Sequence, residues 1–168
     1  KRTYKELDSR SNKLANALLG KGLSKGTRVA IWLTNTLEYL DTYMACAKAG
    51  LVVVQINIRH KPAEAQYQLE NSGAQAIIFC DTVAQYVDQL NLAGDFVTIT
   101  VGKERVKGAV GFEEFLSQGQ DVMPAEPLDD DLLVIGYTSG TTGFPKGAEL
   151  THRSVKTLGQ TNALTNRY

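Results

Sequence analysis

Residues 28–54, RVAIWLTNTLEYLDTYMACAKAGLVVV, contain the pattern that decides the fold class of this chain. The first part, Arg28 to Leu33, is a short apolar run that predicts a buried strand. Thr36 stands at the N-cap position of a helix that is predicted to end at Gly50. Leu51 to Val54 is a second run, and it is apolar on both faces. A strand, a helix and a strand in this order predict two parallel strands joined by a crossover helix.

The same alternation continues on both sides of this unit. Thr3-x-x-Glu6 is a capping box, which predicts a helix that ends near Gly22. The later segments are predicted as a helix from Pro62 to Gly73, a strand from Ala76 to Cys80, a helix from Val83 to Leu92 and a strand from Phe96 to Val101. The predicted fold class is therefore α/β, with a parallel sheet covered by helices on both faces over residues 1–116.

The periodicity ends after Phe115. Residues 117–131 contain two of the four prolines and three consecutive aspartates, so this segment is predicted to be an exposed connector. Residues 132–168 are predicted to hold a strand over Leu132 to Thr138, a loop, a short strand around Ala148 to Leu150 and the start of a helix near His152. The expected organisation is an α/β subdomain, a connector and a hairpin.

Composition excludes several classes of protein. The chain has 168 residues with 18 basic and 18 acidic side chains, so no basic surface predicts a nucleic-acid partner. The longest apolar runs are far shorter than the roughly 18 residues of a membrane span. Cys46 and Cys80 lie apart in apolar segments, which favours buried free thiols in a reducing compartment. We therefore expect a cytoplasmic protein without a transmembrane segment, with peripheral membrane association left open.

One loop has a composition that requires a chemical explanation. Residues 137–147, YTSGTTGFPKG, place four serine and threonine hydroxyls, three glycines and a lysine between two apolar strands. Glycines allow the backbone amides to approach an anion closely, hydroxyls donate hydrogen bonds, and lysine supplies a positive charge. The loop is therefore predicted to bind a polyphosphate. The alternative is a surface hairpin that is merely rich in turn-forming residues.

Two familiar phosphate loops do not fit this segment. A P-loop requires G-x-x-x-x-G-K-[ST] followed directly by a helix. Counted from Gly140, Pro145 stands in place of the second glycine, Gly147 stands in place of the Ser/Thr, and a strand is predicted to follow. The glycine pattern of protein kinases, G-x-G-x-x-G, is also missing from the loop.

YTSGTTGFPKG closely resembles the phosphate-loop motif of the adenylate-forming superfamily, which contains acyl-CoA synthetases, luciferases and peptide-synthetase adenylation domains. The resemblance extends along essentially the whole chain. TYKELDSRSNKLANAL resembles the opening helix of the family, KGTRVAIWLTNTLEYLDTYMACAKAG its first strand–helix unit, and LVVVQINIRH the next strand. Two positions depart mildly from the family pattern: Phe144 lies at a variable position, and Gln55 replaces a common proline.

The resemblance implies an AMP-forming ligase, in which a carboxylate reacts with ATP to give an acyl-adenylate and pyrophosphate, and CoA then forms the thioester. The loop would hold the β- and γ-phosphates of ATP, with Mg²⁺ bridging their oxygens. The residues implied in phosphate binding are Thr138, Ser139, Gly140, Thr141, Thr142, Gly143 and Lys146. Either Thr141 or Thr142 is the candidate Mg²⁺ ligand. The GTTG sequence and Asn57-x-Arg59 favour an acyl- or aryl-CoA ligase over a peptide-synthetase domain.

The family places its adenine pocket, its ribose-binding aspartate, its metal-binding glutamate and its catalytic lysine after the phosphate loop. We therefore expect no catalytic residue within these 168 residues, and a polypeptide of this length is expected to be inactive alone. The alternatives are a peptide-synthetase-type adenylation domain and a non-catalytic module that retains the fold. The implied partners are a small carboxylic acid, ATP and CoA. Oligomeric state and the type of acyl substrate are not predicted.

Other candidate residues have simpler interpretations. His152 is predicted to cap or pack at the start of its helix, and His60 to be solvated in a polar turn. Asp129 to Asp131 are predicted to be a solvated charge run, because consecutive carboxylates point in different directions and are poorly placed to share a metal. The remaining candidates, Trp32, Tyr39 and Tyr43, fit core positions better than a ligand site.

Overall fold

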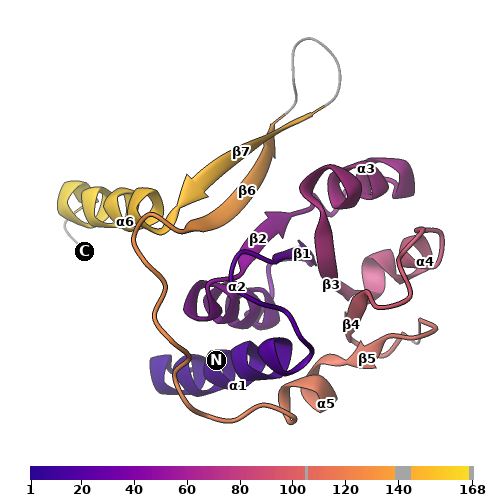
Figure 1. Cartoon of the computed structure of the whole chain (residues 1–168), viewed down its shortest axis with the longest axis horizontal. Coiled ribbons are helices and arrows are strands. Elements are labelled where there is room, and N and C mark those ends of the chain that lie inside the picture. Colours follow the sequence, from indigo (N-terminus) through magenta and orange to yellow (C-terminus); the bar gives the residue numbers. More distant parts are fainter. Residues whose placement is uncertain (105, 139–144, 167–168) are drawn as a thin grey trace.

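The computed structural model describes residues 1–104, 106–138 and 145–166, and these residues build one seven-stranded sheet in the order β5-β4-β3-β1-β2-β6-β7 (Figure 1). The strands are β1 (Arg28–Trp32), β2 (Val52–Gln55), β3 (Ala74–Cys80), β4 (Val97–Val101), β5 (Val110–Gly111), β6 (Leu132–Thr138) and β7 (Lys146–Thr151). Neighbouring strands are parallel except β6 and β7, which are antiparallel. The predicted α/β class is confirmed, and the hairpin strand β6 joins the same sheet as β2.

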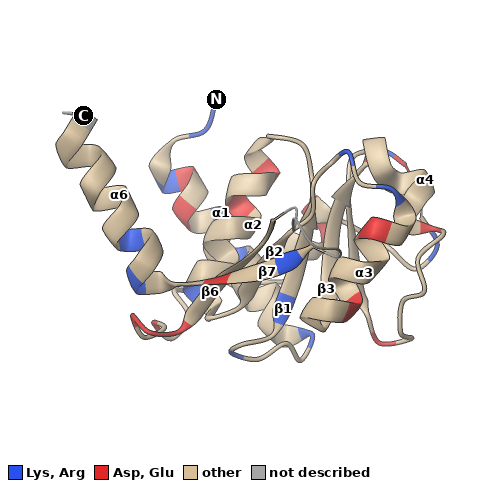
Figure 2. Cartoon of the chain, turned by 90° about the horizontal axis from the view of Figure 1, so that it is seen from above, with Lys and Arg blue, Asp and Glu red and all other residues tan. Residues whose placement is uncertain are grey.

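Helices cover both faces of the sheet. They are α1 (Tyr4–Gly20), α2 (Leu37–Ala49), α3 (Pro62–Ser72), a 3₁₀ turn η1 (Asp81–Val83), α4 (Ala84–Val87), α5 (Phe112–Leu116) and α6 (His152–Asn166). Figures 1 and 2 show α1 and α2 on one face and α3 and α4 on the other. Within the described part of the chain, no helix is both long and apolar enough to cross a membrane.

Local sequence signals explain most element boundaries. The capping box of Thr3 and Glu6 forms as predicted, with the Glu6 amide donating to Thr3 Oγ1 at 3.2 Å. Helices α2 and α3 end at Gly50 and Gly73, which adopt left-handed φ angles of 66° and 63°. Thr36 occupies the predicted N-cap position of α2 but caps nothing. Its buried Oγ1 has no hydrogen-bond partner among the described residues.

One predicted helix was wrong, and two short elements were not predicted. The helix predicted from Val83 to Leu92 is only η1 followed by α4, because the amides of Gln89 and Leu90 donate to the carbonyls of Tyr86 and Val87, three residues earlier. These tight turns stop the α-helical ladder. The sequence also gave no sign of β5 and α5, because elements of two and five residues are too short to show a period.

The hydrophobic core lies between the sheet and its two helix layers. Trp32 and Phe79, from the adjacent strands β1 and β3, are completely buried. Ile31 and Ile78, which precede them in the sequence, are completely buried as well. The Trp32 indole Nε1 donates to the carbonyl of Asn57 at 3.1 Å, so this large side chain also satisfies its polar atom. The predicted core position of Trp32 is confirmed, and the free thiols of Cys46 and Cys80 are buried as well.

A partly buried ionic network joins α1, α2 and α5. The Asp41 side chain on α2 is completely buried and accepts from Arg10 Nε at 2.8 Å and from Arg2. Arg10 also binds Glu113 of α5, and this contact lowers the pKa of the Glu113 carboxyl. This network could not be predicted from the sequence, because its hydrogen-bonded partners lie 31 to 103 residues apart.

The connector of residues 117–131 is exposed along most of its length, as predicted, but it is fastened to α1. Asn16 Nδ2 donates to the Val122 carbonyl at 2.7 Å, and Asn12 Nδ2 donates to the Asp121 carboxylate. Gly119 lies against the backbone of α1, where a Cβ would stand 1.8 Å from the Lys13 carbonyl oxygen. The connector is therefore bound along α1 and is not a free linker.

Strand β7 and helix α6, at the edge of the sheet opposite β5, are largely exposed to solvent. Strand β7 forms one edge of the sheet, and its residues Lys146 to Leu150 are all exposed. Helix α6 extends beyond the end of β7 (Figure 1) and exposes Leu158 and Leu164. On α2, Leu37 and Leu40 are exposed too.

Candidate functional site

The candidate site begins at the point where the β6–β7 hairpin leaves the sheet. Strand β6 pairs with β2 only from Val134 to Gly136, whereas its pairing with β7 continues to Thr138, opposite Lys146. Beyond Gly136, the hairpin is therefore a two-stranded ribbon that projects past the carboxyl end of β2 (Figure 1). In parallel α/β sheets, ligands bind at this edge.

The structure brings two of the predicted phosphate-binding residues together. Thr138 and Lys146 are exposed and are paired across the ribbon. The other predicted residues, Ser139, Gly140, Thr141, Thr142 and Gly143, lie outside the described residues, as does Phe144. The described pair places one hydroxyl and one ammonium group at the two ends of the loop, and this is the polar chemistry that a phosphate requires.

A cavity lies beside the ribbon at the carboxyl ends of β1, β2 and β6. It has a volume of about 580 Å³, and Tyr39, Gln55 and Tyr137 are among its lining side chains. Gln55 Nε2 donates to Tyr39 Oη at 2.7 Å, and burial raises the pKa of the Tyr39 phenol. Sequence analysis placed Tyr39 with the core, and its ring does pack against the core while also lining this cavity.

Helix α3 touches the ribbon through two tyrosines. Tyr67 Oη donates to the carbonyl of Pro145 at 3.1 Å, and Tyr137 Oη donates to Asn71 Oδ1 at 2.7 Å. The two rings meet edge to face with their centroids 6.4 Å apart. Burial is the main cause that raises the pKa of Tyr137. Sequence analysis missed these contacts, because the two hydrogen-bonded pairs are 78 and 66 residues apart in the chain.

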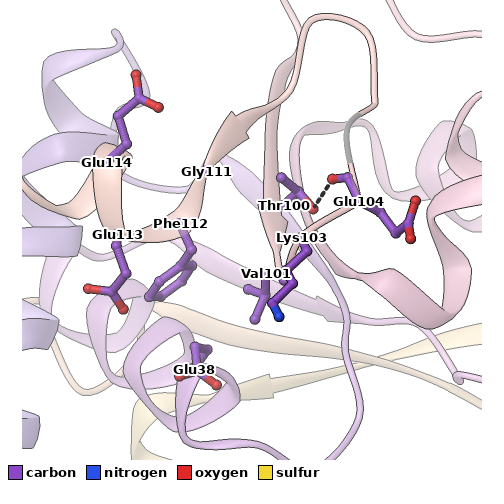
Figure 3. Close-up of a pocket in the computed structure, with 10 residues that line it drawn as sticks. Glu38, Thr100, Val101, Lys103, Glu104, Gly111, Phe112, Glu113 and Glu114 are labelled. Atoms are coloured by element: carbon purple, nitrogen blue, oxygen red, sulfur yellow. Dashed lines mark hydrogen bonds between the residues drawn. The ribbon is translucent and has the colours of Figure 1, made fainter.

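A second cavity, of about 500 Å³, lies at the other end of the sheet (Figure 3). Its walls come from the carboxyl end of β4, from α5 and from the start of α2, and the charged side chains around it include Glu38, Lys103 and Glu113. Thr100 Oγ1 donates to the Glu104 carbonyl at 3.5 Å on one wall. Neither Thr138 nor Lys146, the two predicted phosphate-binding residues that the structure describes, lines this cavity.

The structure also shows the surroundings of two weaker candidates, His152 and His60. His152 begins α6, its backbone amide donates to the Asp131 carbonyl at 3.0 Å, and burial lowers the pKa of its imidazole. His60 is half-buried, with Nδ1 buried and unpartnered among the described residues, so the prediction of a solvated side chain was wrong.

The aspartate run is not simply solvated. Asp131 binds Lys25 Nζ at 2.7 Å, and Asp130 binds Arg153 Nε at 2.9 Å. Asp129 lies within 3.5 Å of Lys156 Nζ. These ion pairs connect the end of the connector to the loop before β1 and to the first turns of α6. The prediction that the three carboxylates diverge was correct, but their partners lie far away in the sequence.

Comparison with known proteins gives consistent results. The family model described as "AMP-binding enzyme" matches residues 1–167. A long-chain-fatty-acid–CoA ligase of Escherichia coli O6:H1 is 32% identical over 96% of this chain, which corresponds to 34% of the relative. The solved fatty acyl CoA synthetase of Mycobacterium tuberculosis is 31% identical, with a TM-score of 0.77 over 92% of this chain and 30% of that chain.

A solved anthranilate CoA ligase, in complex with anthranoyl-AMP, has a TM-score of 0.87 over 94% of this chain and 31% of that one. Its identity of 24% supports a shared fold alone. The chain thus spans about a third of the length of the curated relatives that it matches.

Proposed function

Because this chain belongs to the AMP-binding enzyme family, we propose that it supplies the phosphate-binding hairpin of an AMP-forming acyl-CoA ligase. The observation that carries the proposal is the YTSGTTGFPKG segment, whose described ends project as a ribbon beyond the carboxyl end of β2. The family match over residues 1–167 supports the same assignment. Relatives named as long-chain-fatty-acid–CoA ligases favour a fatty acid as the carboxylate substrate.

In the proposed reaction, a carboxylate oxygen of the substrate attacks the α-phosphorus of ATP, and pyrophosphate leaves. The thiol of CoA then attacks the acyl carbonyl, and AMP leaves as the thioester forms. The role of Thr138 and Lys146 is to hold the β- and γ-phosphates and to compensate their negative charge. Neither residue transfers a proton or forms a covalent bond in this scheme.

Mg²⁺ would neutralise part of the phosphate charge when bound. Its candidate ligands, Thr141 and Thr142, lie outside the described residues, so no step is assigned to them. For the complete enzyme we propose a cytoplasmic location, where both ATP and CoA are available.

Titration of the isotopically labelled chain with magnesium pyrophosphate tests the proposal directly. We expect the amide resonances of Thr138 and Lys146 to shift in a saturable manner, because both residues face the bound phosphates. In Lys146→Ala the apparent affinity should fall, whereas Lys107→Ala should bind as the wild type does. Lys107 is an exposed lysine just before β5, at the opposite edge of the sheet. Shifts that are absent, or that Lys107→Ala abolishes equally, would refute the proposed site.

A polypeptide of these 168 residues should not form acyl-CoA by itself. It corresponds to about a third of each ligase that it resembles, so about two thirds of the length of those proteins has no counterpart in it. Incubation with ATP, Mg²⁺, CoA and a panel of fatty and aromatic acids should release no pyrophosphate above background. Turnover that follows the polypeptide through several purification steps would contradict this prediction.

A further inference from the structure

We infer that Tyr67 of α3 is a positioning residue for the Thr138–Lys146 pair, and that it acts through the carbonyl group of Pro145. The inference rests on the proposed function, since it concerns how accurately the described ends of the phosphate loop are placed. Tyr67 itself lies outside the quoted motif, and its hydroxyl donates to the carbonyl of Pro145, the residue next to Lys146.

The ribbon has few supports within the hairpin itself. Beyond Gly136, strand β6 has lost β2 as a neighbour, and only β7 remains beside it. Strand β7 is an edge strand whose residues from Lys146 to Leu150 are exposed. An isolated two-stranded ribbon is only marginally stable in water. Its position relative to the sheet must therefore depend on contacts from outside the hairpin.

Helix α3 supplies such contacts at both strands. Tyr137 Oη on β6 donates to Asn71 Oδ1 at 2.7 Å, and Tyr67 Oη donates to the carbonyl of Pro145, just before β7, at 3.1 Å. Tyr67 and Asn71 are four residues apart in α3, so they lie on the same face of the helix. One helical face thus holds the start and the end of the loop at the same time.

Pro145 makes the second contact important. Proline has no backbone N–H, so Pro145 cannot continue the ladder of β7 by donating a hydrogen bond. Its carbonyl oxygen is half-shielded from water and accepts from the Tyr67 hydroxyl. Removing that donor would leave the residue next to Lys146 without its link to α3.

Close packing at the base of the ribbon couples the positions of Tyr67 and Tyr137 to the backbone of β7. Gly147 is paired with Tyr137, and a Cβ at Gly147 would lie 2.7 Å from Ile135 Cγ2 and 3.4 Å from Tyr137 Cζ. The edge-to-face contact of Tyr67 with Tyr137 adds a second link at the same level. A shift of either tyrosine therefore displaces the backbone that carries Lys146.

The position of the ribbon affects phosphate binding, because conformational freedom that remains in the free protein is lost when a ligand binds. A lysine side chain already loses rotamer freedom when it contacts a phosphate, and a mobile backbone would add to that cost. Tyr67→Phe removes one hydroxyl, keeps the ring against Tyr137 and changes no charge near the phosphate. It should weaken magnesium pyrophosphate binding by about two- to tenfold, the range expected for one hydrogen bond.

The experiment compares wild type, Tyr67→Phe and the matched control Tyr4→Phe in the full chain. Tyr4 is an exposed residue at the start of α1, with 91% of its surface accessible. Two quantities are measured for each protein: the affinity for magnesium pyrophosphate by titration, and amide hydrogen exchange at residues 138 and 146. In Tyr67→Phe we expect weaker binding and faster exchange at these residues, with unchanged exchange in β1. Tyr4→Phe should match wild type in both measurements.

The outcomes separate the two claims. If wild type does not bind magnesium pyrophosphate, the proposed function is wrong, whatever Tyr67→Phe does to hydrogen exchange. If wild type binds and Tyr67→Phe binds equally well, the proposed function stands and the inference about Tyr67 is wrong. Faster exchange throughout the sheet in Tyr67→Phe would also overturn the inference, because it would show a general loss of stability rather than a local change in the ribbon.

Discussion

Lys146→Ala in the complete ligase is expected to lower kcat/KM for ATP by about ten- to a hundredfold, which corresponds to one charge-assisted contact of about 1.5–3 kcal/mol. Lys146 is the only cationic residue in the segment from Tyr137 to Gly147, and the leaving pyrophosphate carries several negative charges. Backbone amides and Mg²⁺ would supply the rest of the compensation, so the loss should be large but not complete. The fold should remain intact, because the Lys146 side chain is exposed.

Two further variants make this measurement specific. Lys146→Arg should recover only part of the activity, because a planar guanidinium does not replace a compact ammonium group. Lys107→Ala removes an exposed lysine at the opposite edge of the sheet and should leave kcat/KM unchanged. Adenylation rates over a range of ATP concentrations provide the values. If Lys146→Ala loses less than about twofold, Lys146 is a solvated surface charge and the assignment of the loop is wrong.

Trp32→Ala is expected to reduce the free energy of unfolding by about 3–5 kcal/mol, the usual cost of truncating a large buried aromatic side chain. Trp32 is completely buried, stacks on Tyr86 at a centroid distance of 6.2 Å and donates its indole N–H to the Asn57 carbonyl. The substitution leaves a cavity between β1 and α4 and removes a hydrogen bond at the turn after β2. Urea unfolding followed by circular dichroism measures the change.

Leu40→Ala is a suitable control for this effect. Leu40 is also a large apolar residue, but half of its surface is exposed on α2. Its truncation should cost far less than that of Trp32. Equal losses for the two variants would show that Trp32 does not hold the core together in the way that its burial indicates.

Strands β1, β2 and β3 could be predicted from sequence because most of their residues are apolar and buried on both faces. The strand predicted from Leu132 to Thr138 has these bounds in the structure, and Gly50 and Gly73 end their helices as predicted. The shortest elements could not be predicted. The chain after Val87 turns through i→i+3 hydrogen bonds, which have no period that a sequence pattern could reveal.

In the candidate site, too, some features could be predicted from the sequence and others could not. Thr138 and Lys146 were predicted because their motif is continuous in sequence, and the structure pairs them across the ribbon. The contact from Tyr67 to Pro145 could not be predicted, because it spans 78 residues and depends on how α3 lies against the hairpin. Long-range hydrogen bonds of this kind follow from tertiary packing and leave no local signal.

The uncovered edge of β7 also affects how the polypeptide behaves in concentrated solution. An exposed edge strand offers unpaired backbone groups to the same edge of another molecule. Leu158 and Leu164 of the neighbouring α6 add apolar surface that favours association. The sequence isoelectric point of about 6.9 leaves almost no charge repulsion near neutral pH. Self-association should therefore be strongest close to pH 7 and weaker at pH 8.5, where the molecules carry net negative charge.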